Sequence, residues 1–334
     1  MEIYLSNNCL EEIREIKSLK HLNKLIILDL SGNQLSKDPN YRIFTIFHTR
    51  KLKVLNGMPI EPNEQQVARE MFVGRLTEDI LENRLNGKSL KDIKELDLSN
   101  CRLRDFDDIF TGRNFPRLRE LNLSGNYFSS MRIFGQFPTL KVLSLNSNRI
   151  ESLIITNNIH NMKKSKHGLN GLKNLETLDL SNNKLKDLSG LQFCVMPTLK
   201  ILKLENNMLS KIENIKHLVN LKELDVSRNK IRALNPYNRP HSQLPPPINP
   251  PFSQSFSSKM LLKCLKIDNN GLKSFPDLGH LTKLTHLFAN QNRLSDYHDL
   301  DKLKNVLALK ELELTLNPVS RRVGYRNYMI RNVM

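Results

Sequence analysis

The chain has no tryptophan, only four cysteines and few aromatic residues, which make up 6% of its 334 positions. The cysteines, Cys9, Cys101, Cys194 and Cys264, show no paired spacing, so we expect reduced thiols in an intracellular protein. No run of about 18 apolar residues occurs, and the first residues carry an acid and no apolar segment. We therefore expect neither membrane insertion nor a signal peptide.

Catalytic and nucleotide-binding motifs are also missing. The sequence contains no Gly-x-Gly-x-x-Gly, no phosphate loop, no His-Glu-x-x-His and no Gly-x-Ser-x-Gly. Cys264 and His286 could suggest a metal or nucleophile pair, but no oriented carboxylate and no further ligand accompany them. We expect no enzymatic activity, no cofactor and no metal site.

One pattern dominates what is present: Leu-x-x-Leu-x-Leu-x-x-Asn-x-Leu recurs along the chain. Its asparagines are Asn33, Asn126, Asn148, Asn183, Asn207, Asn229, Asn270, Asn292 and Asn317. In the copy from 221 to 231, Leu221, Leu224, Val226 and Ile231 fall on one side of a short strand and its turn. One strand with one return segment cannot bury this apolar face alone, so the repeat predicts a solenoid.

The repeated asparagine stands where each coil turns. Its amide can donate to and accept from backbone groups that the turn leaves unpaired, so stacked copies are expected to form a ladder inside the solenoid. Cys101 replaces asparagine in one coil, where its thiol can serve as a weak donor.

The repeat length indicates what connects the strands. Equivalent leucines are 22 residues apart from Leu121 to Leu143 and from Leu202 to Leu224, which leaves room only for a short helical or 3-10 return. Two longer joints predict surface inserts at residues 157–170, which are basic, and 236–259, which are rich in Pro and Ser. The proline run is read as a loop; docking on a domain that recognises polyproline II is the alternative.

Residues 212–225 resemble the 22-residue leucine-rich repeat of the intracellular family that includes the nuclear regulatory subunit of protein phosphatase 1. This resemblance implies an α/β leucine-rich-repeat solenoid, or horseshoe, with a parallel concave β-sheet and a helical or 3-10 convex side. The family commonly ends in a cap, which Asn317-Pro318-Val319 with Tyr325 and Arg326 resembles, and Tyr41 with Arg42 matches it a second time.

The two cap motifs suggest three segments. Residues 1–57 are expected to be the C-terminal end and cap of a first array, 58–90 a linker helix, and 91–334 a second array. In the linker, apolar residues at helical spacing from Asn63 to Leu85 predict one amphipathic helix that packs on the second array, with a partner-binding helix as the alternative. The closing leucines of the second cap would fall beyond Met334, so we expect an incomplete cap, and either a monomer or part of a longer chain. This arrangement is similar to multi-array leucine-rich-repeat proteins of ciliated cells and testis.

The formal net charge of +17 raises the possibility of a nucleic-acid partner. Basic residues precede most strands, at Lys94, Arg119, Lys141, Lys200, Lys222, Lys263 and Lys310. Acidic residues follow them on the strands, at Glu95, Asp97, Glu120, Asp179, Glu223, Asp225, Glu311 and Glu313. Because these carboxylates would repel phosphate, we expect nucleic acid to be a less favoured partner of the concave face than protein.

A protein partner is therefore expected on the concave face. Val142, Ile201 and Phe288 are the predicted apolar anchors, and Glu223, Asp225, Glu311 and Glu313 the predicted electrostatic contacts. Three functions compete: a cytoplasmic or ciliary scaffold, a phosphatase regulator, and a ribonucleoprotein-associated module, because a spliceosomal leucine-rich protein shares the cap.

Overall fold

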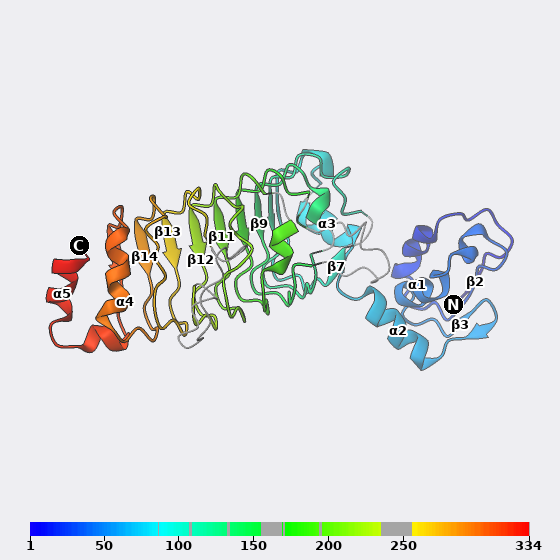
Figure 1. Cartoon of the computed structure of the whole chain (residues 1–334). Helices are drawn as coiled ribbons and strands as arrows, with labels where there is room; N and C mark the ends of the chain where they lie inside the picture. Colours follow the sequence, from blue (N-terminus) through cyan, green and yellow to red (C-terminus); the bar gives the residue numbers. More distant parts are fainter. Residues whose placement is uncertain are drawn as a thin grey trace. The chain divides into compact units, whose positions relative to one another are not determined.

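The computed structural model describes residues 1–85, 87–106, 109–131, 134–154, 169, 171–193, 196–234 and 256–333. The chain divides into two compact units, Met1–Arg75 and Leu76–Met334 (Figure 1). Cys194 and most of the two predicted inserts lie outside the described residues.

The second unit is built on a nine-stranded sheet in which every neighbouring pair of strands is parallel. Its strands are β6 (Glu95–Asp97), β8 (Glu120–Asn122), β9 (Val142–Ser144), β10 (Thr177–Asp179), β11 (Ile201–Lys203), β12 (Glu223–Asp225), β13 (Cys264–Lys266), β14 (His286–Phe288) and β15 (Glu311–Glu313). The central leucines lie side by side in register, including Leu143 with Leu178 and Leu224 with Leu265. Neither of the two long connections therefore interrupts the stack.

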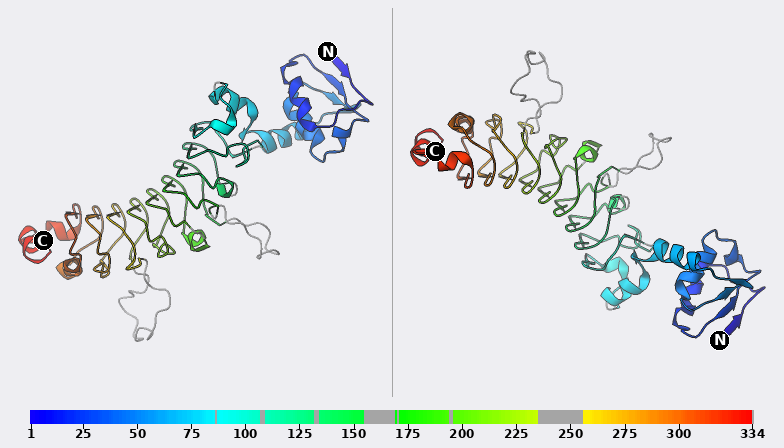
Figure 2. Two further views of the ribbon diagram at one scale, coloured as in Figure 1. Left: turned by 90° about the horizontal axis from the view of Figure 1, so that it is seen from above. Right: turned by 90° about the horizontal axis from the view of Figure 1, so that it is seen from below.

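The interior of the second unit is a column of apolar side chains. The central strand leucines from β6 to β14 are buried, as are the apolar residues that precede and follow each strand. The described returns are short, with 3-10 helices η3 (Leu90–Asp92), η4 (Phe134–Gln136), η6 (Ser189–Phe193) and η7 (Lys302–Asn305) and the helix α4 (Tyr297–Asp301). Figure 2 shows these coils stacked one behind another. The predicted leucine-rich-repeat solenoid is thus confirmed.

The N-terminal end of the second unit is covered by α3 (Glu78–Leu85), which follows β5 (Arg75–Leu76). Leu76, Leu81 and Leu85 are buried in the same core as the coils. Beyond them, the Phe106 ring stacks on Phe110 and Phe128, with centroid separations of 4.3 and 4.9 Å. Phe106 belongs to β7 (Asp105–Phe106), so aromatic packing fills the first coils where the repeat pattern is least regular.

The first unit has its own sheet and core. Parallel strands β1 (Glu2–Tyr4), β2 (Ile27–Asp29) and β3 (Val54–Leu55) are followed by antiparallel β4 (Met58–Pro59). The unit also contains η1 (Ile13–His21), η2 (Gln34–Lys37), α1 (Tyr41–His48) and α2 (Pro62–Phe72). The Phe72 ring of α2 lies 5.4 Å from Phe44 and 5.3 Å from Phe47 of α1, so α2 packs on the cap of this unit.

The single linker helix predicted from Asn63 to Leu85, packed on the second array, is wrong. Helix α2 ends at Phe72, and Gly74 follows in the left-handed region at φ 83°, where a helix cannot continue. Ala68 is buried and Phe72 packs inward, whereas Val67 and Met71 of the predicted apolar face are exposed. The apolar spacing therefore belongs to two helices, one serving each unit.

Candidate protein-binding face

The outward side chains of the second sheet form two straight rows, because residues on either side of a buried strand leucine point away from the core. We call them the first row and the second row. The first row is Glu95, Glu120, Val142, Thr177, Ile201, Glu223, Cys264, His286 and Glu311. The second row is Asp97, Asn122, Ser144, Asp179, Lys203, Asp225, Lys266, Phe288 and Glu313.

The predicted apolar anchors occupy two separate places. Val142, Thr177 and Ile201 are in-register neighbours in the first row, and all three are half-buried. Phe288 lies in the second row on β14, three strands beyond Ile201, which corresponds to about 14 Å along the sheet. The face thus carries an aliphatic patch on β9 to β11 and an aromatic position near its end.

The charged residues around Phe288 already bond to one another. Lys266 Nζ lies 3.0 Å from Glu223 Oε1, and His286 Nε2 lies 3.6 Å from Glu311 Oε2. The hydrogen bond to Glu223 raises the pKa of Lys266, which stays cationic. Of the four carboxylates predicted to select a partner, Glu223 is therefore already paired with the Lys266 cation.

Asp225 has a structural role that the sequence reasoning missed. Its Oδ1 accepts the backbone N–H of Ser227 at 3.0 Å, and Asp97 and Asp179 accept from Ser99 and Ser181 in the same way. The hydrogen bonds that Asp97 accepts from Ser99 lower the pKa of the Asp97 carboxyl. The Asp-x-Ser spacing in the repeat was the available signal: such an aspartate fixes the turn after its strand as well as facing solvent.

Asp268 adds a carboxylate to this face beyond those that the sequence predicted. It is half-buried, and its Oδ1 accepts the backbone N–H of Asn290 at 2.6 Å. Burial and the nearby charges of Asp225 and Glu313 raise its pKa. Together with Glu311, these groups make the β12 to β15 end of the face acidic.

The eight asparagines predicted for the ladder share one bonding pattern. Asn207 Nδ2 donates to the carbonyls of Leu180 and Leu204 at 3.0 and 3.1 Å, and its Oδ1 accepts from Leu185 N at 3.0 Å. The equivalent bonds are made by Asn126, Asn148, Asn183, Asn229, Asn270, Asn292 and Asn317. Each amide thus joins its own coil to the preceding one, whereas Cys101 donates to Ser99 O at 3.3 Å.

The two cap motifs differ in their contacts. Arg42 Nε and Nη2 donate to the two carboxylate oxygens of Glu64 at 2.6 and 2.9 Å, and Nη2 also donates to Pro59 O at 2.8 Å. Tyr41 is buried and donates to Asn56 Oδ1.

In α5 (Tyr325–Asn332), which follows η8 (Pro318–Arg321), Tyr325 is half-buried and Arg326 is exposed. Among the described residues, no ion pair of Arg326 is found. Tyr328 instead stacks on Tyr297 at 4.4 Å, which fastens α5 to α4.

Basic residues line the margin of the sheet where the strands begin. This leading margin consists of Lys94, Arg119, Lys141, Glu176, Lys200, Lys222, Lys263, Thr285 and Lys310, joined by a ladder of backbone hydrogen bonds. Its one carboxylate, Glu176, lies 2.9 Å from Lys141 Nζ and 2.5 Å from Lys200 Nζ. Hydrogen bonds from both lysines lower the pKa of Glu176 to about 2.

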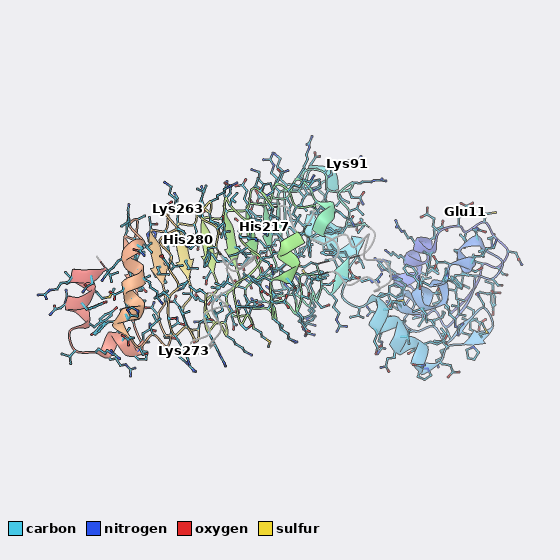
Figure 3. The ribbon with its side chains drawn as sticks, viewed as in Figure 1. Glu11, Lys91, His217, Lys263, Lys273 and His280 are labelled. Atoms are coloured by element: carbon cyan, nitrogen blue, oxygen red, sulfur yellow. The ribbon has the colours of Figure 1, made fainter. Side chains whose placement is uncertain are left out.

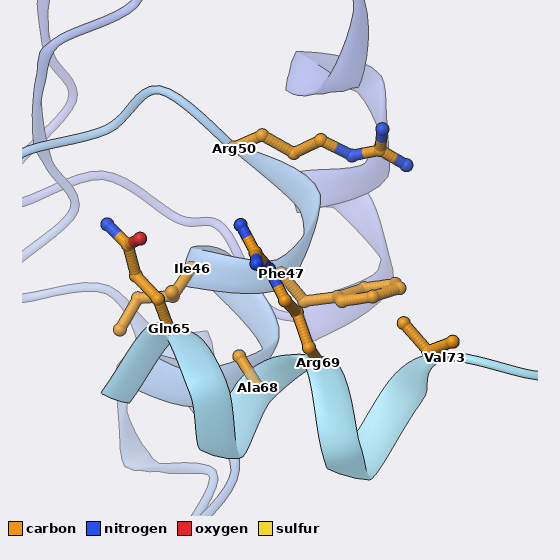
Figure 4. A pocket seen from close by; sticks show the side chains of 7 residues that line it. All are labelled: Ile46, Phe47, Arg50, Gln65, Ala68, Arg69 and Val73. Atoms are coloured by element: carbon orange, nitrogen blue, oxygen red, sulfur yellow. The ribbon is translucent and has the colours of Figure 1, made fainter. Parts of the chain in front are cut away.

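The first unit holds a cleft of about 300 Å³ between α1 and α2 (Figure 4). Its lining consists of Ile46, Phe47, Arg50, Gln65, Ala68, Arg69 and Val73. This lining offers no carboxylate, histidine or thiol for acid–base or nucleophilic chemistry.

Cys264 and His286 are direct neighbours on β13 and β14. Burial raises the pKa of the Cys264 thiol, which opposes formation of a reactive thiolate. Across the described ranges, no group of three or more His, Cys, Asp or Glu residues could hold a metal ion, and no helix is long and apolar enough to span a membrane.

Four family models match parts of this chain. The model described as "Leucine-rich repeat" matches residues 1–85, and "Leucine Rich repeats (2 copies)" matches 197–239. The models "Leucine rich repeat" and "Leucine Rich Repeat" match 151–209 and 117–137. The repeated unit is therefore the leucine-rich repeat in both units of the chain.

Several known proteins are similar to a segment of the chain. The U2 small nuclear ribonucleoprotein A' of Homo sapiens is 30% identical over 74 residues, which is 22% of this chain and 29% of that protein. The Arabidopsis thaliana protein of the same name is 32% identical over 77 residues, or 23% of this chain and 31% of that one. Centriolin of Mus musculus is 31% identical over 85 residues, 24% of this chain but 4% of centriolin. The chain thus spans less than a third of the length of these relatives.

Solved structures agree on the fold. An internalin C2 from Listeria monocytogenes aligns over 71% of this chain and 91% of its own, with a TM-score of 0.52 and 19% identity. The LRIM1/APL1C complex aligns over 80% of this chain and 39% of that chain, with a TM-score of 0.50 and 18% identity. At these identities the likeness concerns the fold alone.

Proposed function

We propose that the concave face of the second unit is a non-catalytic, protein-binding surface. The observation that carries this proposal is the aliphatic patch of Val142, Thr177 and Ile201, which the sheet holds in register on three adjacent strands. Because backbone pairing fixes these side chains before any partner arrives, little conformational entropy is lost on binding. Apolar contact at a preformed, partly desolvated centre is typical of the residues that dominate interface affinity.

The charge of the face specifies the complementary partner. Around the aliphatic patch, Glu120 and Asp179 are acidic, and the β12 to β15 end carries Asp268, Glu311 and Glu313. A partner segment with apolar residues at its centre and basic residues toward β15 would match this pattern. Phe288 then serves as a second anchor beside those carboxylates.

A second candidate function is a role in a ribonucleoprotein. The similarity to U2 small nuclear ribonucleoprotein A' supports it, because that name describes a protein of a small nuclear ribonucleoprotein. The match covers only 29% of that protein, so we propose the assembly class and not the same partner. The phosphatase and ciliary roles expected from the sequence are not proposed, because the relatives named above do not support them.

Site-specific crosslinking tests the concave-face proposal. A photoreactive amino acid placed at Ile201 should crosslink a protein partner in cells, and Val142→Glu with Ile201→Glu should abolish its co-purification. Leu307→Glu is the matched control, because Leu307 is an exposed apolar residue outside both rows. Retention of the partner by the Val142 and Ile201 variant, with loss in the Leu307 variant, would place binding elsewhere.

A further inference from the structure

A second charged margin runs along the other side of the sheet, after the ladder asparagines. In each coil the second residue after the asparagine is buried, as for Ile150, Leu185 and Ile231. The chain is extended there, so the first and third residues after the asparagine point outward. These outward positions are not part of the concave rows.

Backbone hydrogen bonds hold these segments in a continuous file. Lys184 N donates to Ile150 O at 2.9 Å, and Gly271 N donates to Ile231 O at 2.8 Å. Met208 and Lys230 make the same bond to the coils before them. Outward side chains on adjacent coils are therefore spaced by about 4.8 Å, as in a parallel sheet.

We call this file the trailing margin. It is strongly basic on five adjacent coils, those of Asn148, Asn183, Asn207, Asn229 and Asn270. Six of its ten outward positions are cations, namely Arg149, Lys184, Lys186, Lys230, Arg232 and Lys273. Glu151 is the one carboxylate among the ten. All six cations are exposed, and none forms an ion pair within the part of the chain that the structure describes.

The two margins face different surroundings. Figure 3 shows Lys263 of the leading margin and Lys273 of the trailing margin on opposite sides of the second unit. The leading margin adjoins the carboxylates of the first row, and its lysines Lys141 and Lys200 both form ion pairs with Glu176. Asp187 and Asp296, which lie four residues after the ladder asparagines Asn183 and Asn292, accept backbone N–H groups of Ser189 and His298.

An aromatic group adds to the trailing margin at its upstream end. The Arg149 guanidinium lies 4.2 Å from the centre of the Tyr127 ring, and Tyr127 is half-buried on the preceding coil. A ring that is held in place by a cation offers a surface on which a base can stack. Arg102, Arg104 and Arg293 extend the charge to the coils on either side.

We propose that the trailing margin binds the phosphate backbone of single-stranded RNA. Its six cations stand on four of the five coils, so neighbouring cationic coils are separated by one or two strand spacings, about 4.8 or 9.6 Å. A positively charged file of this kind can follow a flexible single-stranded backbone, which adjusts its phosphate spacing to the protein. Met208 is its one large apolar side chain, so it has little to insert into a lipid bilayer. This surface is separate from the concave face, so either proposal can hold without the other.

Fluorescence anisotropy with a labelled 15-nucleotide oligouridine RNA tests the assignment on the full chain. With four to six phosphates neutralised, log K should fall with log salt with a slope of about −3 to −4. Replacing Lys184, Lys186, Lys230 and Arg232 with Gln should weaken binding at least tenfold and flatten the slope by up to about 3. The matched control replaces Lys94, Arg119, Lys222 and Lys263 of the leading margin with Gln and should change affinity less than threefold.

The remaining outcomes overturn the proposal. Equal weakening by both quadruple variants would mean diffuse attraction by net charge. Absence of RNA binding at 50 mM salt, or binding of phosphatidylserine vesicles in its place, would exclude RNA as the ligand. Far-UV circular dichroism checks that both variants fold, and retained RNA binding by Ile201→Glu distinguishes this site from the concave face.

Discussion

The side chain of Asn207 hydrogen-bonds to four backbone groups of two coils, three of them buried, and its removal should be costly. It is 7% exposed, and Asn207→Ala leaves the carbonyls of Leu180 and Leu204 and the N–H of Leu185 without their side-chain partner. A buried polar group that loses its partner costs about 1–3 kcal/mol. Allowing for some relaxation, we expect a total loss of about 3–5 kcal/mol.

This loss is large compared with the roughly 5–15 kcal/mol that separates folded from unfolded domains. In a unit of this size it should lower the melting temperature by about 6–15 °C. Far-UV circular dichroism is the suitable probe because the chain has no tryptophan. Hydrogen exchange should also show a loss of protection at the Leu185 amide.

The neighbouring residue provides the control for this prediction. Asn206 is exposed, adopts a left-handed φ of 53°, and donates to Asn182 Oδ1 on the surface. Asn206→Gly keeps that backbone conformation and should change stability by less than about 0.5 kcal/mol. A loss below about 1 kcal/mol in Asn207→Ala, or unchanged protection of Leu185, would refute the view that the ladder holds the coils together.

Two further predictions concern charged groups. The Glu176 carboxyl should titrate near pH 2 by NMR, and Lys141→Gln should move its pKa back toward the ordinary 4.5. Because this pKa is lowered on folding, its stabilising contribution is present above pH 4.5 and is lost as the pH falls toward 2; a midpoint near 4.5 in the unaltered chain would contradict the paired geometry. Arg42→Ala should destabilise the first unit by about 1–2 kcal/mol, since a two-pronged bond to Glu64 is lost, and should speed hydrogen exchange in α1 and α2. Arg326→Ala, at the equivalent position of the other cap motif, should change exchange little, and equal effects of the two substitutions would show that the caps do not differ.

The sheet of the second unit was predictable because its spacing is periodic. The interval between Leu121 and Leu143 corresponds to one coil, and the central leucines pair as that interval implies. The longer interval from Leu224 to Leu265 predicts one coil with an insert, and the two leucines are in register. Apolar periodicity determines register because a shift by one residue would turn the buried side chains outward.

The linker and the use of the charges were not predictable in the same way. Apolar spacing from Asn63 to Leu85 is compatible with one helix, and the break depends on the backbone conformation of Gly74. Glu223 is bonded to Lys266, which lies 43 residues later in the sequence, on the coil that follows the second insert. Charge pairing across coils requires the rotamers of both side chains, which no repeat pattern encodes.

The bonding of the ladder has a consequence for how such a protein can vary. Each asparagine reaches only the coil before its own, even when that coil lies 38 residues back, as for Asn183 and Leu145. A whole coil could therefore be gained or lost without changing the contacts of the others. One coil added between Ile201 and Phe288 would move these two residues apart by one strand spacing, about 4.8 Å. Partner geometry could be adjusted in such steps while the chemistry of each contact stayed the same.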